Sequence, residues 1–274
     1  MYPYLELGSF RISTYGLMAV LAALVGCVFA ARRFKRFGFP KDTWASIGTY
    51  IIIGVLVGSK LLYFITVWDD FIGDIGKVPF AEFSRRYITG GLVFYGGILA
   101  AMLSVLLYTK IHKLSFARMS VAMTPAMPLI HGIARIGCFL SGCCGGSVYG
   151  LPVQLVESAC LFALFFVLMA ACKPTAKRPI GLGLYLVIYP VVRFILEFFR
   201  TDELRGFVGA LSTSQFISCL LLPIGILMVI FADPLFAAID RFMLKGAAAG
   251  SETAAEETIP EPAEENASDE PEDR

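Results

Sequence analysis

Apolar residues in this chain gather in long runs instead of alternating with polar residues. The bilayer core is about 30 Å thick, and a helix needs roughly 20 apolar residues to cross it. Seven runs approach that length: Tyr15 to Ala31, Trp44 to Val67, Gly91 to Tyr108, Met119 to Leu140, Val153 to Cys172, Ile180 to Phe199 and Leu211 to Phe231. The pattern predicts an all-α polytopic membrane protein with seven transmembrane helices.

Composition agrees with a membrane location. Hydrophobic residues make up 57% of the chain and charged residues 16%, and the mean hydropathy is +0.72. A soluble domain carries about 25% charged residues, so one water-soluble core would not hide this much apolar surface. The segment Met1 to Arg11 lacks the basic start of a cleavable signal peptide. We therefore expect the first apolar run to be a permanent span.

Basic residues are divided unevenly between the two sides of the predicted bundle. The loops after the first, third, fifth and seventh runs hold thirteen lysines and arginines, whereas the other side holds six. The side richer in Lys and Arg is normally cytoplasmic. We therefore expect the N-terminus to be periplasmic and the C-terminus cytoplasmic.

The charge also divides the chain into a membrane domain, residues 1–245, and a tail, residues 246–274. The last 24 residues hold ten acidic residues and one basic residue, so the remainder carries a net charge of +10. We expect the acidic tail to be disordered. The basic remainder favours anionic membrane lipid as a partner, and nothing predicts nucleic acid. The outer loop, residues 68–90, is long enough to form a small amphipathic element.

Ionisable side chains within apolar runs are expensive and often functional. His131 and Arg135 are four residues apart, as are Arg193 and Glu197, so each pair shares one helix face. One interpretation is structural: Arg193 pairs with Glu197 and Lys60 with Glu157, which holds the bundle together. The other interpretation is a binding site. The six residues concerned are Lys60, His131, Arg135, Glu157, Arg193 and Glu197.

Two glycine-rich segments favour a binding site. Residues 131–146 contain Arg135 and five glycines. Glycine lets a backbone approach a ligand closely, and arginine binds phosphate with two parallel hydrogen bonds. We therefore predict a phosphate site at the outer face, although a tight turn and close helix packing would use the same glycines. In the second segment, residues 89–97, Tyr95 stands between two glycine pairs, near the expected depth of lipid head groups.

Seven segments of the chain are informative when taken together: Tyr15 to Met18, Gly58 to Tyr63, Gly90 to Gly97, Gly132 to Gly146, Gln154 to Glu157, Arg193 to Arg200 and Ser214 to Ser218. In this order, they resemble the prolipoprotein diacylglyceryl transferase family. The resemblance extends over the membrane domain and implies a multi-pass protein of the bacterial inner membrane. It also implies that the substrates are phosphatidylglycerol and prolipoprotein signal peptides with a lipobox cysteine.

The resemblance also implies roles for individual residues. Arg135 and Arg193 are expected to hold the phosphate and to act in catalysis together with Tyr95. The other substrate-binding candidates are Tyr15, Lys60, Gly146, Tyr189 and Glu197.

Three positions depart from the family's usual pattern. Tyr95 replaces a histidine, Cys138 an asparagine and Cys143 a glutamate. An ordinary phenol has a pKa of about 10 and is a weak base near neutrality, but a nearby arginine favours the phenolate. His131 is the other candidate base, although we expect it to be a buried neutral histidine bonded to another span.

The implied reaction transfers the diacylglyceryl group to the cysteine thiol and releases glycerol 1-phosphate, without a metal or soluble cofactor. The rival interpretation is a transporter or a non-catalytic lipid-binding protein, but no internal repeat supports it. Metal or redox chemistry at Cys138, Cys143 and Cys144 is a third interpretation. Their spacing fits no common zinc pattern, and a structural disulfide on the oxidising outer side is the simpler expectation.

Overall fold

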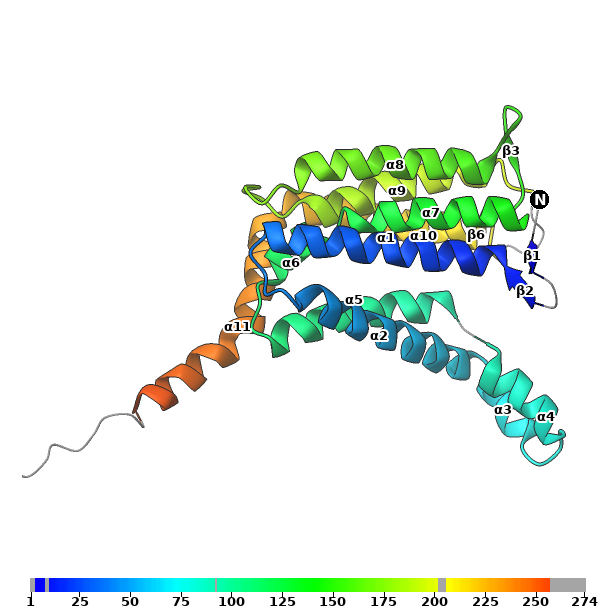
Figure 1. Cartoon of the computed structure of the whole chain (residues 1–274), viewed down its shortest axis with the longest axis horizontal. Coiled ribbons are helices and arrows are strands. Elements are labelled where there is room, and N and C mark those ends of the chain that lie inside the picture. Colours follow the sequence, from blue (N-terminus) through cyan, green and yellow to red (C-terminus); the bar gives the residue numbers. More distant parts are fainter. Residues whose placement is uncertain (1–2, 8–9, 92, 202–205, 257–274) are drawn as a thin grey trace, which may run out of the picture.

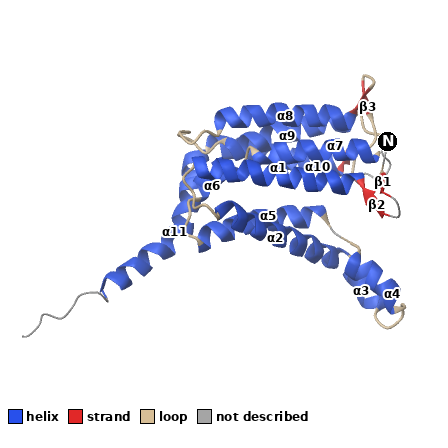
Figure 2. Ribbon diagram, viewed as in Figure 1, coloured by secondary structure: helices blue, strands red, loops and turns tan. Residues whose placement is uncertain are grey.

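The computed structural model describes residues 3–7, 10–91, 93–201 and 206–256. Seven of its helices lie roughly side by side (Figure 1). They are α1 (Thr14–Arg36), α2 (Thr43–Thr66), α5 (Phe94–Ile111), α7 (Ala126–Ser141), α8 (Val153–Ala171), α9 (Gly181–Glu197) and α10 (Thr213–Ile230). The predicted all-α class is therefore confirmed, with short hairpins at one end (Figure 2).

Among the residues that the structure describes, four helices are long and apolar enough to cross a membrane: α1, α2, α8 and α10. The apolar helix Gly96–Ile111 within α5 is shorter. Serine residues cap the N-termini of two of these helices. Ser13 accepts a hydrogen bond from Gly16 N at the start of α1, and Ser212 forms a capping box with Gln215 at the start of α10.

The fourth apolar run was predicted as one continuous helix, and this prediction is wrong. The chain instead forms α6 (Phe116–Met123) and then α7, with Thr124 and Pro125 between them. Proline has no backbone N–H to donate and its ring crowds the preceding turn, so an uninterrupted helix is disfavoured there. The Thr124 hydroxyl donates to the carbonyl oxygen of Ser120 at 2.7 Å and closes the last turn of α6.

The helices form a main bundle and a separate pair. Helices α1, α7, α8, α9 and α10 pack into the bundle, while α2 and α5 run alongside it (Figure 1). Glycine allows the α2–α5 pair to approach closely, because a Cβ atom on Gly96 would collide with the Gly58 carbonyl oxygen. Small residues at helix contacts are typical of membrane bundles.

The two ends of the bundle differ. One end carries the N-terminal hairpin of β1 (Tyr4–Leu7) and β2 (Phe10–Ser13), together with β3 (Ser147–Val148), β4 (Leu151–Pro152), β5 (Phe207–Val208) and β6 (Leu211–Ser212). The other end carries α6 and α11 (Ala232–Glu256). There the Asp240 carboxylate accepts hydrogen bonds from the Ser115 hydroxyl at 2.6 Å and from Ala117 N at 3.2 Å, which ties α11 to the start of α6.

The loop of residues 68–90 forms a small helical arm. It consists of α3 (Trp68–Asp74), α4 (Phe80–Phe83) and the π-helix η1 (Ser84–Thr89). The Tyr87 hydroxyl donates to Asp74 at 2.7 Å and Arg86 Nη1 lies 2.6 Å from the same oxygen. Both donors lower the pKa of the Asp74 carboxyl below its usual range, and the hydrogen bond from Tyr87 has the larger effect.

The expected boundary between membrane domain and tail falls inside α11. The helical backbone passes residue 245 and continues to Glu256. The rest of the predicted tail, residues 257–274, lies outside the described residues.

Candidate active site

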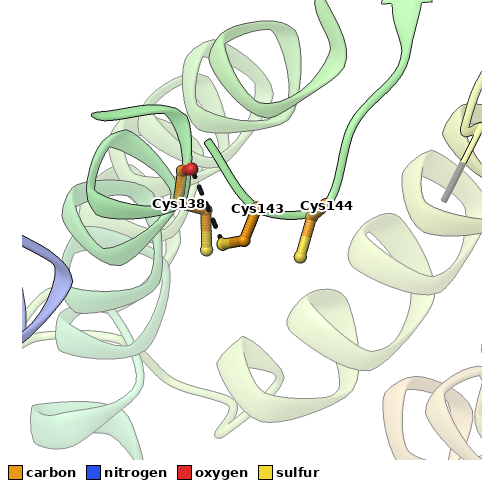
Figure 3. A group of neighbouring side chains, drawn as sticks. All are labelled: Cys138, Cys143 and Cys144. Carbon is orange, nitrogen blue, oxygen red and sulfur yellow. Dashed lines mark hydrogen bonds between the residues drawn. The ribbon is translucent and has the colours of Figure 1, made fainter. Parts of the chain in front are cut away.

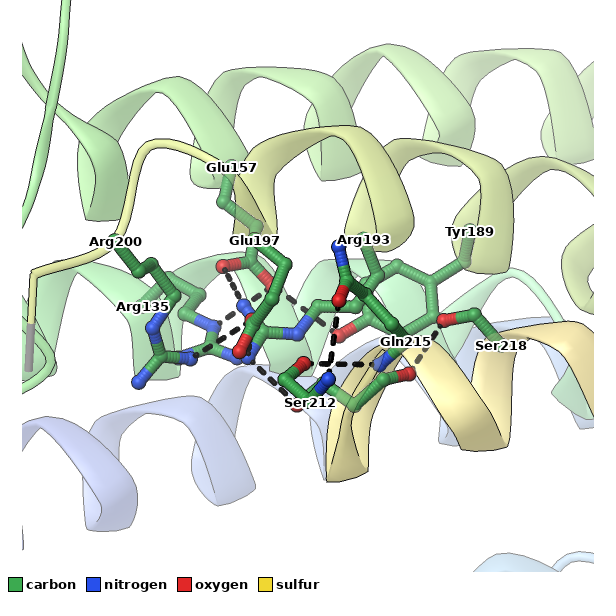
Figure 4. Close-up of polar contacts among 10 residues, drawn as sticks. Arg135, Glu157, Tyr189, Arg193, Glu197, Arg200, Ser212, Gln215 and Ser218 are labelled. Atoms are coloured by element: carbon green, nitrogen blue, oxygen red, sulfur yellow. Dashed lines mark hydrogen bonds and ion pairs between the residues drawn. The ribbon is translucent and has the colours of Figure 1, made fainter. Parts of the chain in front are cut away.

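Five charged side chains meet between the helices, toward the end that carries the hairpins (Figure 4). They come from α7, from the start of α8, from the last turns of α9 and from the residues that follow α9. We call them the arginine–glutamate cluster: Arg135, Glu157, Arg193, Glu197 and Arg200.

Glu157 joins two of the arginines. Its Oε1 atom lies 3.0 Å from Arg135 Nε, and its Oε2 atom lies 3.4 Å from Arg193 Nη1. The Tyr189 hydroxyl donates to Oε1 at 3.1 Å. The Glu157 residue is only 1% exposed. Burying a carboxylate without a partner is costly, and Glu157 is paired with both arginines, so it holds both guanidinium groups in place.

Arg193 extends the cluster toward the end of α9. Its Nη2 atom lies 2.8 Å from Glu197 Oε2 and donates to the Ser214 hydroxyl at 3.0 Å. Arg200 Nη1 lies 3.7 Å from the same Glu197 oxygen. Three guanidinium groups therefore face two carboxylates. The five side chains carry a net charge of +1, which makes the cluster suited to binding an anion.

Arg135 is the most accessible member of the cluster. Its side chain is 14% exposed, compared with 9% for Arg193 and 9% for Arg200. The contact between Arg135 Nε and Glu157 is an ion pair that lacks the alignment of a hydrogen bond. A guanidinium held by charge in this way still has donors in its planar fork for a phosphate.

The loop that contains Gly146 brings the end of α9 against the end of α7. Gly146 forms a β-bridge with Arg200. Ser147 N donates to Phe199 O at 3.2 Å, and Thr201 N donates to Gly145 O at 3.1 Å. Gly146 has a φ of 151°, and a Cβ atom there would collide with the Phe199 carbonyl oxygen and approach Arg200 Cα to 2.9 Å. The position of Arg200 in the cluster therefore depends on a glycine at 146.

We expect Gly146→Ala to lower the free energy of unfolding by about 1–3 kcal/mol, because it adds both a steric clash and an unfavourable φ. Gly150→Ala is the matched control, since Gly150 also has a positive φ, 88°, but no neighbouring atom within 4 Å of a Cβ. Thermal unfolding of both variants in the same detergent measures the difference. Equal destabilisation of the two variants would contradict the importance of the contact with Phe199 and Arg200.

The start of α10 supports Arg193 from the other side. The Ser212 hydroxyl accepts a hydrogen bond from Gln215 N at 3.2 Å, and the Gln215 side chain accepts one from Ser212 N at 3.1 Å. Ser218 donates to the Ser214 carbonyl oxygen at 2.8 Å. This capping box fixes the first turn of α10 and with it the hydroxyl of Ser214, the partner of Arg193.

The structure brings together most of the predicted site residues. Arg135, Arg193, Glu197 and Tyr189 lie in or against the cluster. Tyr15, in the first turn of α1, lies beside α7: a Cβ atom on Gly137 would be 3.5 Å from its ring.

Two candidates are placed differently. Tyr95 is the second residue of α5, and its side chain lies outside the described part of the structure. Under the structural interpretation Lys60 would pair with Glu157, but the structure pairs Glu157 with Arg135 and Arg193. Lys60 Nζ instead donates to the carbonyl oxygens of Ile88 at 3.0 Å and Gly90 at 2.6 Å. It therefore holds the end of the helical arm, where η1 leaves carbonyl groups without helical partners.

His131 lies one turn before Arg135 on α7 and is partly buried. Its ring packs edge-on against Tyr189, with ring centroids 4.9 Å apart. Tyr189 in turn stacks on Tyr185 at 5.6 Å. This aromatic contact with α9 places His131 one helical turn further into the bundle than the cluster.

Sequence reasoning missed Arg200, Ser214 and Gln154 as parts of the site. Gln154 Nε2 donates to the carbonyl oxygen of Cys143 at 2.8 Å and holds the loop after α7. One available signal was the spacing of Arg200, which follows Glu197 by three residues and so reaches back to the same turn. Ser214 carried no such signal, because its role depends on α10 packing against α9.

The three cysteines near Arg135 also come together. The sulfur atoms of Cys138, Cys143 and Cys144 lie within 4.8 Å of one another, and all three thiols are free. The expected structural disulfide is therefore not formed. Cys144 lies in the loop beyond α7, and its pKa is lowered to about 5, first by a hydrogen bond from Cys138 and then by the guanidinium groups of Arg200 and Arg135.

Comparison with known proteins assigns this chain to a family. The sequence model of the family described as prolipoprotein diacylglyceryl transferase matches residues 3–231. A phosphatidylglycerol–prolipoprotein diacylglyceryl transferase of Clostridium tetani is 34% identical over 240 residues, covering 81% of this chain and 93% of that protein. One of Clostridium perfringens is 31% identical over 242 residues, covering 81% and 92%. The chain therefore belongs to the prolipoprotein diacylglyceryl transferase family.

Proposed function

We propose that this protein transfers the diacylglyceryl group of phosphatidylglycerol to the lipobox cysteine thiol of prolipoproteins. The observation that carries the proposal is the net charge of +1 on the arginine–glutamate cluster. The phosphodiester of phosphatidylglycerol carries one negative charge, so the substrate completes the charge balance of the cluster. The names of the curated relatives supply both substrates and disfavour a transporter or a non-catalytic lipid-binding protein.

In the proposed reaction, the sulfur of the thiolate bonds to the glyceryl carbon that carries the phosphoester. The bond between that carbon and the phosphate oxygen breaks, and glycerol 1-phosphate leaves with the bonding electrons. The thiol proton passes to a base. A phosphodiester has one negative charge, whereas a phosphomonoester has about 1.5 to 2 at pH 7. Arg135 and Arg193 stabilise this additional charge as it develops.

The remaining candidates act in binding. Tyr15, Gly146, Tyr189 and Glu197 shape and orient the phosphate site. Lys60 stands in a shallow apolar depression on α2, lined also by Leu56, Val57, Leu61 and Phe64. An ammonium group above an apolar surface suits a lipid with an anionic head group, because the aliphatic stem follows the acyl chains and the charge stays near the interface.

We also propose seven membrane crossings, with α6 and α7 together forming the fourth. The loop charges place the end with the hairpins in the periplasm and α11 in the cytoplasm. The arginine–glutamate cluster then lies on the periplasmic side of the inner membrane.

The direct test uses purified full-length protein, phosphatidylglycerol labelled in its glycerol backbone, and a synthetic lipobox peptide. Labelled peptide and released glycerol 1-phosphate are expected in equal amounts. A peptide with serine in place of the lipobox cysteine is the control. Binding of the lipid without transfer under any condition would favour the lipid-binding interpretation.

Tyr95 is the proposed proton acceptor, or a donor to the phosphate. We expect Tyr95→Phe to lower the transfer rate at least about tenfold, and His131→Gln to lower it by less than about threefold, because His131 is a turn deeper and packs against Tyr189. Transfer rates measured against pH distinguish the two residues. An unchanged profile in Tyr95→Phe, with an ionisation lost in His131→Gln, would move the role to His131.

We expect deletion of residues 251–274 to leave the transfer rate unchanged, because that acidic segment has too few apolar residues to pack against the bundle. The rate is measured at equal amounts of inserted protein. Deletion from residue 232 is the contrasting variant, since it also removes Asp240, which binds the start of α6. A large loss of rate in the shorter deletion would show that the tail takes part in the reaction.

A further inference from the structure

The loop after α7 is built to bring three thiols to one place (Figure 3). Cys138 is in the last turn of α7, and Cys143 and Cys144 follow the end of the helix. Gly142 ends α7 with a φ of 77°, which turns the chain back toward Cys138. The three sulfur atoms then lie within 4.8 Å of one another.

Hydrogen bonds hold this arrangement. Cys143 N donates to the Cys138 carbonyl oxygen at 3.1 Å. The Ser141 hydroxyl lies 3.3 Å from Cys143 Sγ, and Gln154 Nε2 donates to Cys143 O at 2.8 Å. Cys144 has a φ of 59°, a conformation that non-glycine residues adopt rarely. Such strain persists where the surrounding contacts hold it, as they do around this loop.

The three thiols also differ in accessibility in a way that suits a ligand. Cys138 is buried, Cys144 is partly buried, and Cys143 is exposed. The cluster is therefore open to solvent at Cys143 and shielded by protein at Cys138.

We propose that Cys138, Cys143 and Cys144 form a three-sulfur site for one thiophilic metal ion, zinc(II) or copper(I). Zinc–sulfur bonds of about 2.3 Å place the sulfurs of one centre about 3.8 Å apart, so small side-chain movements suffice. Each thiol loses its proton to solvent as its sulfur bonds the metal, and no oxidation state changes. Metal binding at this site, which adjoins Arg135, does not require the proposed transfer reaction. Soft thiolate ligands exclude magnesium and calcium.

The test measures metal binding by purified, reduced full-length protein. Zinc(II) and copper(I), each buffered by a chelator, are dialysed against the protein in separate experiments, and bound metal is counted by elemental analysis. We expect about one ion per chain, with affinity reduced more than about tenfold in each of Cys138→Ser, Cys143→Ser and Cys144→Ser. Cys219→Ser, an exposed thiol on α10, is the matched control and is expected to bind normally.

A second measurement uses the unaltered protein, so its outcome does not depend on the folding of variants. Bound metal is expected to protect Cys138, Cys143 and Cys144 from alkylation, as mapped by mass spectrometry, and to leave Cys27 and Cys219 unprotected. Absence of stoichiometric binding of both metals would overturn the proposal. So would equal binding by all three serine variants, or a disulfide among these cysteines in protein isolated without oxidant.

Discussion

Arg135→Lys is expected to lower the rate of diacylglyceryl transfer about 100-fold to 1,000-fold, the usual loss when one transition-state donor is removed. Arg135 has the most accessible side chain of the three arginines in the cluster, and its contact with Glu157 leaves part of its planar fork for a phosphate. Lysine keeps the charge but presents a single compact ammonium. The substitution therefore removes the directional contacts and preserves the net charge.

Transfer rates at saturating and at low phosphatidylglycerol separate the effect on the chemical step from the effect on binding. Arg178→Lys is the matched control, because Arg178 forms an exposed ion pair with Asp233 at 2.7 Å, near the start of α11. That variant is expected to keep at least about half of the normal rate, since exposed ion pairs contribute little. Near-normal transfer by a well-inserted Arg135→Lys protein would remove Arg135 from the active site.

Glu157→Gln is expected to affect both stability and activity. The variant keeps the size of the side chain but leaves Arg135 and Arg193 without the carboxylate they share. Breaking a buried ion pair typically costs about 3–5 kcal/mol, because the remaining charge is buried without a partner. The transfer rate is expected to fall about 100-fold as well, since a guanidinium displaced by about 1 Å no longer fits the transition state.

Unfolding in detergent and the transfer rate are measured on the same preparation. Glu82→Gln is the control, because Glu82 forms an exposed ion pair with Arg86 at 3.1 Å and has the same substitution. Its unfolding free energy is expected to change by less than about 1 kcal/mol. If Glu157→Gln is as stable and as active as the control, Glu157 does not organise the cluster.

The helices and the membrane class follow from patterns within about 20 neighbouring residues. Burial of a run such as Val153 to Cys172 in a bilayer depends on its own composition and length, so the sequence predicts the helix without knowledge of its neighbours. The same local logic explains why Arg193 and Glu197 were expected on one helix face. The signal for the helix break, Pro125, is also local. The apolar residues on both sides of it nevertheless made the run resemble one continuous helix.

The tertiary structure decided which charges meet. Lys60 and Arg135 were both reasonable partners for Glu157 by charge, and only the packing of α7 against α8 selects Arg135. Arg200 joins the cluster because Gly146 lets two loops touch, a contact between residues 54 positions apart in the sequence. The three cysteines fit no familiar metal spacing, yet the left-handed turn at Gly142 brings their sulfurs together. Such contacts depend on the relative positions of whole helices and loops, which no local pattern of residues encodes.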